Sequence, residues 1–206
     1  MSEREPTVYA VDDEPATLKA IARLLRAAGW SVAPFASPRD FLEKLDSAAP
    51  GCLVLDLSMP QMTGLEVQQA LGARGLAMPI VFLTGRADIP TSVKAMKQGA
   101  ADFLTKPVDE EDLLAAVARA VERDAAARRD RAEVAAIEGR LAALTPRERE
   151  VLEHVISGKL NKQIAADLGT AEKTVKVHRG RVMAKLGVTS VADLVRLAER
   201  AGVRPA

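Results

Sequence analysis

The sequence predicts an α/β domain with a doubly wound, five-stranded parallel sheet, then a helical linker, then an all-α domain of four helices. In the first half, short apolar runs alternate with segments of helical periodicity, which is typical of a parallel sheet covered on both faces. After residue 144 every segment has helical periodicity. A chain of 206 residues is long enough for two such domains, each with its own core.

Five apolar runs are expected to be the strands of the first domain, at residues 7–11, 30–34, 52–55, 79–83 and 101–104. Apolar residues at helical spacing follow each run. The helices are expected to pass through Leu18, Ile21 and Leu25; through Phe41 and Leu42 after a Ser37 N-cap; through Val67 and Leu71 after Gly64; over residues 93–98; and onward from Asp109. The last helix opens with four acidic residues, which favour a helix N-terminus. We place the first domain at residues 1–123.

The helix that starts near Asp109 has no evident end. No proline lies between Leu113 and Leu141, and Gly139 is the only glycine there. Residues 124–131 are rich in Ala and Arg, which favour helix by propensity but bury little apolar surface. We expect a helical linker at residues 124–140, with a continuous helix and a flexible tether as the alternatives.

The predicted all-α domain spans residues 141–206. Thr145, Pro146 and Glu148 form the signature of a capping box at the start of its first helix. Asn161 is expected to cap a short second helix. A third helix runs from residue 170 or 171 to Leu186, and Ser190 opens a fourth through Leu194 and Leu197.

Composition sets limits on the protein class. No apolar run approaches the roughly 18 residues of a membrane span, and the N-terminal segment is too polar for a secretory signal, so we expect a cytoplasmic protein without membrane contact. The single cysteine, Cys52, lies in a strand pattern and is expected in the core. Residues 1–123 carry a formal charge of −4 and residues 124–206 a charge of +5, which favours a polyanionic partner for the second half.

Acidic side chains follow two of the predicted strands. Asp12, Asp13 and Glu14 follow the first strand, and Asp56 ends the third. Because ligands bind beyond the carboxyl ends of parallel strands, these acids are expected to converge. Like charges so close together require a cation, and oxygen ligands of this type suit Mg²⁺.

These residues predict a phosphoryl-acceptor site. Asp56 is the expected acceptor, since a carboxylate nucleophile forms an acyl-phosphate. Asp12 and Asp13 are expected to hold Mg²⁺. Lys106 supplies a fixed cation for the phosphoryl oxygens, and Thr84 ends the fourth strand within reach of them.

Residues 6–122 resemble the receiver domain of two-component response regulators. The matching elements are Val11-Asp12-Asp13-Glu14, Asp56-Leu57-Ser58-Met59-Pro60 with Gly64, Leu83-Thr84-Gly85, and Lys106-Pro107. The resemblance implies a flavodoxin-like fold, phosphoryl transfer from a histidine kinase to Asp56, and a backbone carbonyl of Ser58 in the metal site. It also implies a cis Lys106–Pro107 bond, and Thr84 and Phe103 as a switch pair that moves on phosphorylation.

Arg86 lies two residues after Thr84. We consider two interpretations of it: a solvated arginine, or a guanidinium that shields the acyl-phosphate from water.

The third helix of the all-α domain carries a cationic face. Its cations are Lys173, Lys176, Arg179, Arg181 and Lys185, against one acid, Glu172. At about 100° per residue, Val175, Val182 and Leu186 face the core. Small residues lie on the outward face, so the helix is predicted to enter the major groove of double-stranded DNA.

Residues 141–203 resemble the LuxR-type helix-turn-helix domain. The resemblance rests on Leu144-Thr145-Pro146-Arg147-Glu148, Val151-Leu152, Gly158, Asn161-Lys162, Ile164-Ala165, Thr174-Val175-Lys176-Val177-His178 and Lys185-Leu186. It implies that Lys176 and Val177 approach bases. The predicted DNA contacts are Lys162, Lys173, Thr174, Lys176, Val177, Arg179, Arg181 and Lys185. His154 and His178 lack a second ligand at metal spacing, so we interpret them as packing or helix-end residues.

Together the two halves resemble the NarL/FixJ family of transcription regulators, on its FixJ-like branch. The resemblance implies a regulator rather than an enzyme, with a histidine kinase, DNA, a second copy of the chain and RNA polymerase as partners. Phosphorylation is expected to remodel a dimer face near Val93, Lys97, Ala101 and Leu113. Leu194 and Leu197 are expected to add a second dimer contact.

Two other classes of function stay open at this point. One is a constitutive DNA binder whose first domain serves as a dimerisation scaffold; the intact acidic site argues against it. The other is a phosphorelay carrier or phosphatase-like enzyme, against which the basic helix argues.

Overall fold

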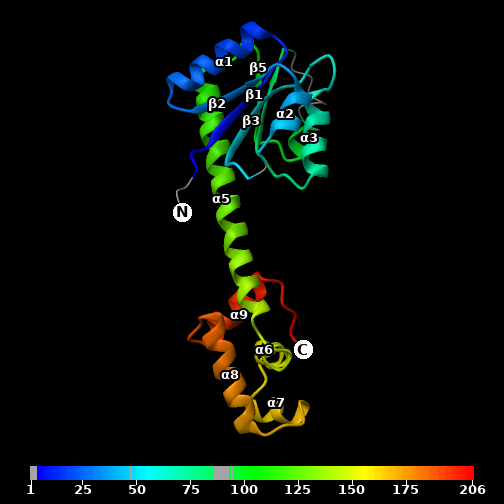
Figure 1. Cartoon of the computed structure of the whole chain (residues 1–206), viewed down its shortest axis with the longest axis vertical. Coiled ribbons are helices and arrows are strands. Elements are labelled where there is room, and N and C mark those ends of the chain that lie inside the picture. Colours follow the sequence, from blue (N-terminus) through cyan, green and yellow to red (C-terminus); the bar gives the residue numbers. More distant parts are fainter. Residues whose placement is uncertain (1–3, 47, 86–92, 94) are drawn as a thin grey trace. The chain divides into compact units, whose positions relative to one another are not determined.

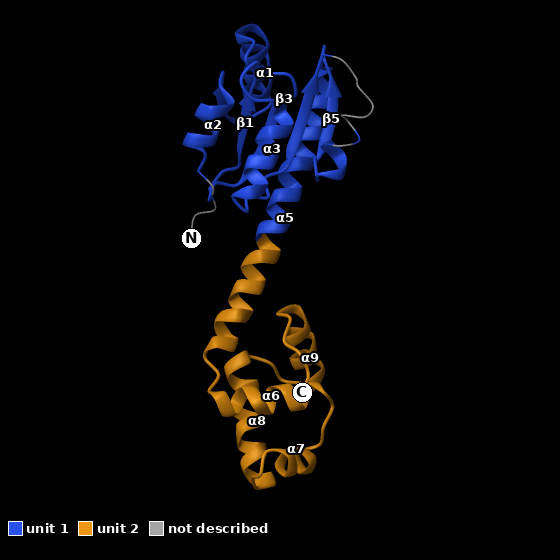
Figure 2. Cartoon of the chain, turned by 90° about the vertical axis from the view of Figure 1, so that its right-hand side faces the viewer, with its two compact units in different colours: residues 1–128 blue, residues 129–206 orange. Residues whose placement is uncertain are grey.

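The computed structural model describes residues 4–46, 48–85, 93 and 95–206. The chain divides into two compact units, residues 1–128 and 129–206, which Figure 2 colours separately. Of the helices in the described ranges, none combines the length and the apolar character needed to cross a membrane.

The first unit contains a five-stranded parallel sheet. Its strands are β1 (Thr7–Val11), β2 (Ser31–Phe35), β3 (Gly51–Asp56), β4 (Ile80–Thr84) and β5 (Asp102–Thr105). They lie in the order β2-β1-β3-β4-β5, and every pair is parallel. This is the flavodoxin-like order of doubly wound sheets. The predicted fold class is therefore confirmed.

Helices cover both faces of the sheet (Figure 1). They are α1 (Pro15–Ala27), α2 (Pro38–Lys44), α3 (Gly64–Ala73) and the first turns of α5 (Glu110–Ala142). On one face α1 and α5 pack against the sheet around Leu25 and Val117, and on the other α2 and α3 pack around Phe41 and Leu71. Residue 93 and residues 95–97 are helical, in agreement with the predicted fourth helix.

The strand predictions are correct within one residue at most ends, because the buried apolar runs that signal a strand also end where the sheet ends. Ser37 caps α2, as predicted, by accepting a hydrogen bond from the backbone of Asp40. Cys52 is fully buried in β3. Burial raises the pKa of its thiol to about 12, and the nearby charge of Asp124 adds to this shift.

Helix α5 runs without interruption through the predicted linker at residues 124–140. Two of its residues bind the loop before β3. The buried Asp124 accepts hydrogen bonds from the Gly51 N–H at 2.9 Å and from Arg128 Nε at 2.6 Å. Arg128 in turn donates to the carbonyls of Ala48 and Ala49. These contacts hold α5 against the first unit as far as residue 128. The domain boundaries expected from the sequence, after residue 123 and after residue 140, stay predictions.

The second unit is all helical. It contains the end of α5 with α6 (Pro146–Ile156), α7 (Asn161–Asp167), α8 (Glu172–Leu186) and α9 (Val191–Arg200). Its core includes Ile137 and Leu141 of α5 together with Leu152, Ile164 and Leu186. The last turns of the predicted linker therefore belong to this core.

Most helix starts in this unit are as predicted. Thr145 and Glu148 form the capping box of α6, and Ser190 caps α9. The prediction for Asn161 was wrong by one position, since Leu160 precedes the helix and the Gln163 side chain accepts its N–H. The Asn161 amide oxygen instead accepts a hydrogen bond from Arg179 of α8 at 3.0 Å.

Candidate functional site

An acidic site lies at the carboxyl ends of β1 and β3, where the strand order of the sheet reverses. Asp12 directly follows β1 and Asp56 is the last residue of β3. The two strands are hydrogen-bonded neighbours in register from Thr7↔Gly51 onward, so both carboxylates leave the sheet at the same edge. They are almost completely buried, with 1% of Asp12 and 4% of Asp56 exposed. This crevice is where ligands bind in sheets of this type.

One ammonium group joins the two buried carboxylates. Lys106 Nζ lies 2.7 Å from Asp12 Oδ2 and 2.8 Å from Asp56 Oδ1. Burial alone lowers the pKa of Lys106, but the hydrogen bonds and charges of the two carboxylates outweigh it and raise that pKa above its ordinary value. The lysine therefore stays charged at neutral pH and is held between the two acids.

A third carboxylate completes the cluster. Asp12, Asp13 and Asp56 each offer an oxygen, and these oxygens lie within 4.8 Å of one another. Asp13 is exposed, so the cluster opens to solvent on one side. Oxygens bound to Mg²⁺ at about 2.1 Å lie up to about 4.2 Å apart, so small side-chain adjustments bring these three to metal-ligand spacing. The donor set therefore fits a hard divalent cation.

Local backbone contacts hold the carboxylates in place. The Glu14 N–H donates to Asp12 Oδ1 at 2.9 Å, and the Ser58 N–H donates to Asp56 Oδ2 at 3.2 Å. Gly64 lies against the backbone that follows Asp56, where an added Cβ would be 2.7 Å from the Asp56 carbonyl oxygen and 3.1 Å from Leu57 Cα. Only glycine fits this close approach.

The predicted switch residues lie on the neighbouring strands. Thr84 is the buried last residue of β4, and its carbonyl accepts the Lys106 N–H at 2.7 Å. The half-buried Phe103 of β5 pairs with Phe82, with ring centroids 6.3 Å apart. The Lys106–Pro107 bond is cis, as the resemblance implied. Arg86 lies outside the described residues.

A second candidate surface is the outward face of α8. Val175, Val182 and Leu186 are buried, as the helical spacing predicts. Among the predicted DNA contacts, those exposed on α7 and α8 are Lys162, Lys173, Thr174, Lys176, Val177, Arg181 and Lys185. Val177, an apolar residue on this cationic face, is 46% exposed.

Two of the predicted DNA contacts already have protein partners. Arg179 donates to Asn161 and so ties α8 to α7. Lys185 Nζ lies 2.7 Å from Glu148 Oε2 and 3.0 Å from the Ala143 carbonyl oxygen. Glu148 was expected only as part of a capping box, and its pairing with Lys185 was not predicted. The contacts of Asp124 and Arg128 were not predicted either, although the i,i+4 spacing of their opposite charges was an available signal.

Comparison with known families places both candidate surfaces within matched regions. Residues 8–118 match the family described as "Response regulator receiver domain". Residues 142–198 match the family described as "Bacterial regulatory proteins, luxR family". The first region contains Asp12, Asp13 and Asp56, and the second contains α8.

Similarity to known proteins extends over nearly the whole chain. Response regulator protein TmoT of Ectopseudomonas mendocina is 44% identical over 200 residues, covering 97% of this chain and 91% of that protein. Transcriptional regulatory protein FixJ of Azorhizobium caulinodans is 42% identical, with coverages of 97% and 94%. The solved structure of response regulator StyR has 45% identity and a TM-score of 0.86, covering 95% of this chain and 99% of StyR.

Proposed function

Because the chain belongs to the FixJ-like response regulators, transcription regulators of two-component systems that join a receiver domain to a LuxR-type DNA-binding domain, we propose that Asp56 is its phosphorylation site. In this proposal a histidine kinase phosphorylates Asp56 in a Mg²⁺-dependent reaction. Phosphorylation then promotes dimerisation and binding to promoter DNA.

The position of Lys106 is the main support for this assignment. Its ammonium bonds Asp56 on one side and Asp12 on the other, so it lies where the oxygens of a phosphoryl group on Asp56 would arrive. In the transfer, an Asp56 oxygen attacks phosphorus, the N–P bond of a phosphohistidine breaks, and the departing imidazole takes up a proton. Lys106 stabilises the charge on the transferred oxygens.

The groups that would hold Mg²⁺ are the carboxylates of Asp12, Asp13 and Asp56 and the backbone carbonyl of Ser58. When bound, the ion neutralises charge on the phosphoryl oxygens and orients them for in-line attack. The exposure of Asp13 leaves the site accessible to both the ion and the donor.

A groove beside the acidic site supports a protein as the phosphoryl donor. It has a volume of about 850 Å³ and lies between α1 and the segment that joins β5 to α5. Its wall includes Lys106 together with the apolar side chains of Ile21, Leu24 and Val108. A donor domain seated in this groove would bring its phosphohistidine close to Asp56.

Thr84 and Phe103 are the proposed link to the dimer face. Thr84 ends the strand next to β3 and directly follows Leu83, the residue that pairs with Asp56, and Phe103 lies on the adjoining strand. Movement of Thr84 toward the phosphoryl group would vacate space for the half-buried Phe103 ring to turn inward.

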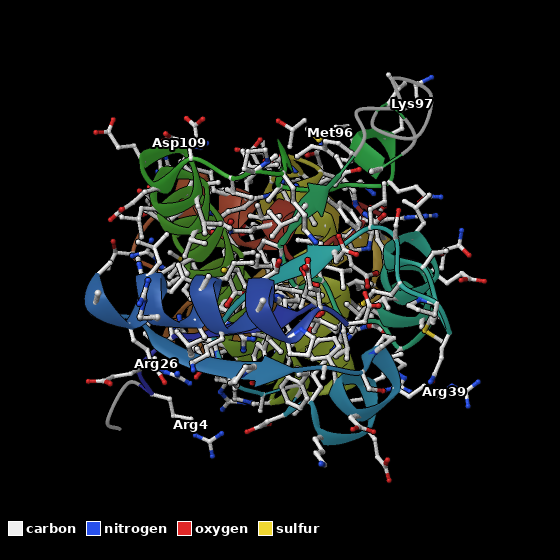
Figure 3. The ribbon with its side chains drawn as sticks, turned by 90° about the horizontal axis from the view of Figure 1, so that it is seen from above. Arg4, Arg26, Arg39, Met96, Lys97 and Asp109 are labelled. Atoms are coloured by element: carbon white, nitrogen blue, oxygen red, sulfur yellow. The ribbon has the colours of Figure 1, made fainter. Side chains whose placement is uncertain are left out.

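The proposed dimer face includes Val93 and Met96, which are 46% and 48% exposed. Figure 3 shows Met96 and Lys97 on the same side of the molecule as Asp109, which directly precedes α5. Leu113 was wrongly assigned to this face, because it is 1% exposed and packs from α5 into the core beside the sheet. Leu194 was wrongly assigned for the same reason, since it is fully buried in the core of the second unit.

For DNA binding, α8 is the proposed recognition helix. Among the described residues, no ion pair engages Lys162, Lys173, Lys176 or Arg181, so these cations are available to phosphates. The exposed Val177 suits an apolar contact with a thymine methyl group. In a dimer, two such helices would read half-sites about 34–36 Å apart. RNA polymerase is a further proposed partner at the promoter.

One experiment tests the core of this proposal. Incubation with acetyl phosphate and Mg²⁺ is expected to add the mass of one phosphoryl group to the wild type and to Asp40→Asn, a control at an exposed aspartate, but not to Asp56→Asn. The same treatment is expected to increase both the dimer fraction by light scattering and the affinity for duplex DNA. A wild type that gains no mass, or an Asp56→Asn variant that still gains it, contradicts the assignment. Mass gain without any change in DNA affinity favours a constitutive DNA binder.

A further inference from the structure

Lys185 lies in the last turn of α8, and its ammonium binds two oxygens of the protein although its side chain is 37% exposed. It is 2.7 Å from Glu148 Oε2 and 3.0 Å from the carbonyl oxygen of Ala143. The Glu148 residue is 2% exposed, so the pair is closed to solvent on the carboxylate side. The contact joins the recognition helix to the start of α6.

The same carboxylate oxygen has a second partner. Glu148 Oε2 accepts the Thr145 N–H at 2.9 Å, as part of the capping box of α6. The hydrogen bond from Lys185 is the largest cause that lowers the pKa of Glu148 to about 2, followed by the one from Thr145. Glu148 is therefore ionised at neutral pH and satisfied by groups from two elements.

A further contact fastens the same end of α8. Arg140 Nη1, from the last turns of α5, donates to the Leu186 carbonyl at 3.2 Å. The other side of α8 is tied to α7 by Arg179 and Asn161. The recognition helix is thus held at two places by polar contacts, and Glu148 supplies the only buried charge among the described residues in them.

We propose that Glu148 and Lys185 form a positioning pair that sets how α8 is presented to DNA, and that Lys185 does not contact phosphate. This inference rests on the proposed role of α8 in DNA binding and reassigns one residue predicted to touch DNA. An ammonium drawn out to a phosphate would leave the buried Glu148 carboxylate without its cation, which is unfavourable. The closed pair is also neutral, so it releases no counterion on binding.

Salt dependence separates the two roles of a lysine. A lysine that neutralises a phosphate contributes about 0.9 to the slope of log K against log salt concentration, whereas an internal pair contributes nothing. Lys176 is the matched control, because it is an exposed lysine on the same helix without an ion pair in the described structure. The probes are a duplex selected by the full-length wild type from a random pool and a scrambled duplex of the same length.

We expect Lys176→Met to lower the slope by about 0.9 on both duplexes. Lys185→Met is expected to keep the wild-type slope but to lose about tenfold in affinity for the selected duplex, with less loss on the scrambled one. Glu148→Gln keeps an acceptor for Thr145 and loses only the charge, so it should reproduce the Lys185→Met effect. Lys185→Arg, which preserves the pair, should restore the selective affinity.

The double variant Glu148→Gln/Lys185→Met is expected to lose no more affinity than either single variant, because each removes the same interaction. All binding is measured at a temperature where circular dichroism shows the variants fully folded. A Lys185→Met slope reduced like that of Lys176→Met would overturn the inference, and so would an unchanged selective affinity or additive losses. Failure of the wild type to bind either duplex would instead overturn the proposed DNA-binding function.

Discussion

The acidic cluster of the receiver domain and the Glu148–Lys185 pair of the DNA-binding domain are built from the same groups, yet their charge balance differs. Each places a lysine ammonium 2.7 Å from a buried carboxylate. In the cluster one ammonium contacts two of the three carboxylates, and the third, Asp13, is exposed. In the pair one ammonium meets one carboxylate, which also caps a helix.

This difference separates a reactive site from a structural one. Excess negative charge that opens to solvent attracts a metal ion, and a bound metal ion can neutralise the oxygens of a phosphoryl group. In the balanced pair one positive charge neutralises one negative charge, so no surplus charge is left to attract a metal ion. The surplus of carboxylates, more than the presence of a lysine–carboxylate contact, therefore marks the functional site.

Removal of the receiver lysine should produce the largest change in stability. Lys106→Met leaves two buried carboxylates without their cation, so we expect the free energy of unfolding to fall by about 3 kcal/mol in the absence of Mg²⁺. Added Mg²⁺ should recover much of this loss. Urea unfolding followed by tryptophan fluorescence measures it, because Trp30, in the receiver domain, is the only tryptophan.

Lys19→Met, at an exposed position of α1, is the control and should change stability little. If Lys106→Met were as stable as this control without Mg²⁺, the two buried carboxylates would not depend on the lysine for their stability.

A glycine substitution tests the close packing behind Asp56. Gly64→Ala brings a Cβ within 2.7 Å of the Asp56 carbonyl oxygen, so we expect a loss of about 1–3 kcal/mol in unfolding free energy. Gly72→Ala, in the same helix, meets nothing within 4 Å and should stabilise by up to about 1 kcal/mol. Equal effects of the two changes, measured by urea unfolding, would show that the close approach does not matter.

Acid should weaken the DNA-binding domain through Glu148. Its pKa is lowered from 4.5 to about 2, chiefly by the hydrogen bond from Lys185, so its contribution to stability is present above pH 4.5 and is lost as pH falls through about 2. Hydrogen exchange of α6 and α8 amides between pH 5 and pH 2 should record the loss. Glu148→Gln should make this protection less dependent on pH.

Glu66 provides the matched comparison, because it closes the same kind of capping box with Thr63 and is exposed. Hydrogen bonds from Thr63 lower its pKa as well, but without a lysine partner. Glu66→Gln should therefore flatten the pH response of α3 less than Glu148→Gln flattens that of α6. The reverse order would contradict the role given to Lys185.

The smallest expected effect concerns Cys52, whose pKa shows the effect of burial on an ionisable group that has no cationic partner. Its pKa is raised to about 12 by burial, whereas that of the buried Glu148 is lowered. Cys52 should not react with iodoacetamide in the folded protein at pH 8, and should react fully in urea. Mass spectrometry measures both, and rapid labelling of the folded protein would contradict the burial of β3.

Much of the receiver fold and its site could be predicted because both depend on local signals. Apolar runs mark the buried strands, and Asp12 and Asp56 follow such runs directly. A parallel sheet brings the ends of its strands to one edge, so the acids had to converge. The N-cap of α7 was predicted at the wrong residue. The Asn161 side chain accepts a hydrogen bond from Arg179, which is distant in sequence, so a local sequence pattern could not reveal this interaction.

The dimer face was predicted less well for a similar reason. Leu113 and Leu194 were expected on an exposed face of their helices, but both are buried. Helical spacing alone does not define the exact edge of the buried stripe of a helix. Whether such a residue meets solvent depends on which neighbouring elements pack over it.

Taken alone, the sequence determined the order of strands and helices, the acids at the strand ends and the cationic helix, since periodicity and strand-end chemistry are encoded within a few residues. Only the tertiary structure decided that Lys106 bridges Asp12 and Asp56, that Lys185 bonds Glu148, and that Asp124 and Arg128 bind the loop before β3. These contacts join residues up to 94 positions apart. The sequence around a charged residue does not show which distant residue will lie next to it in the folded protein.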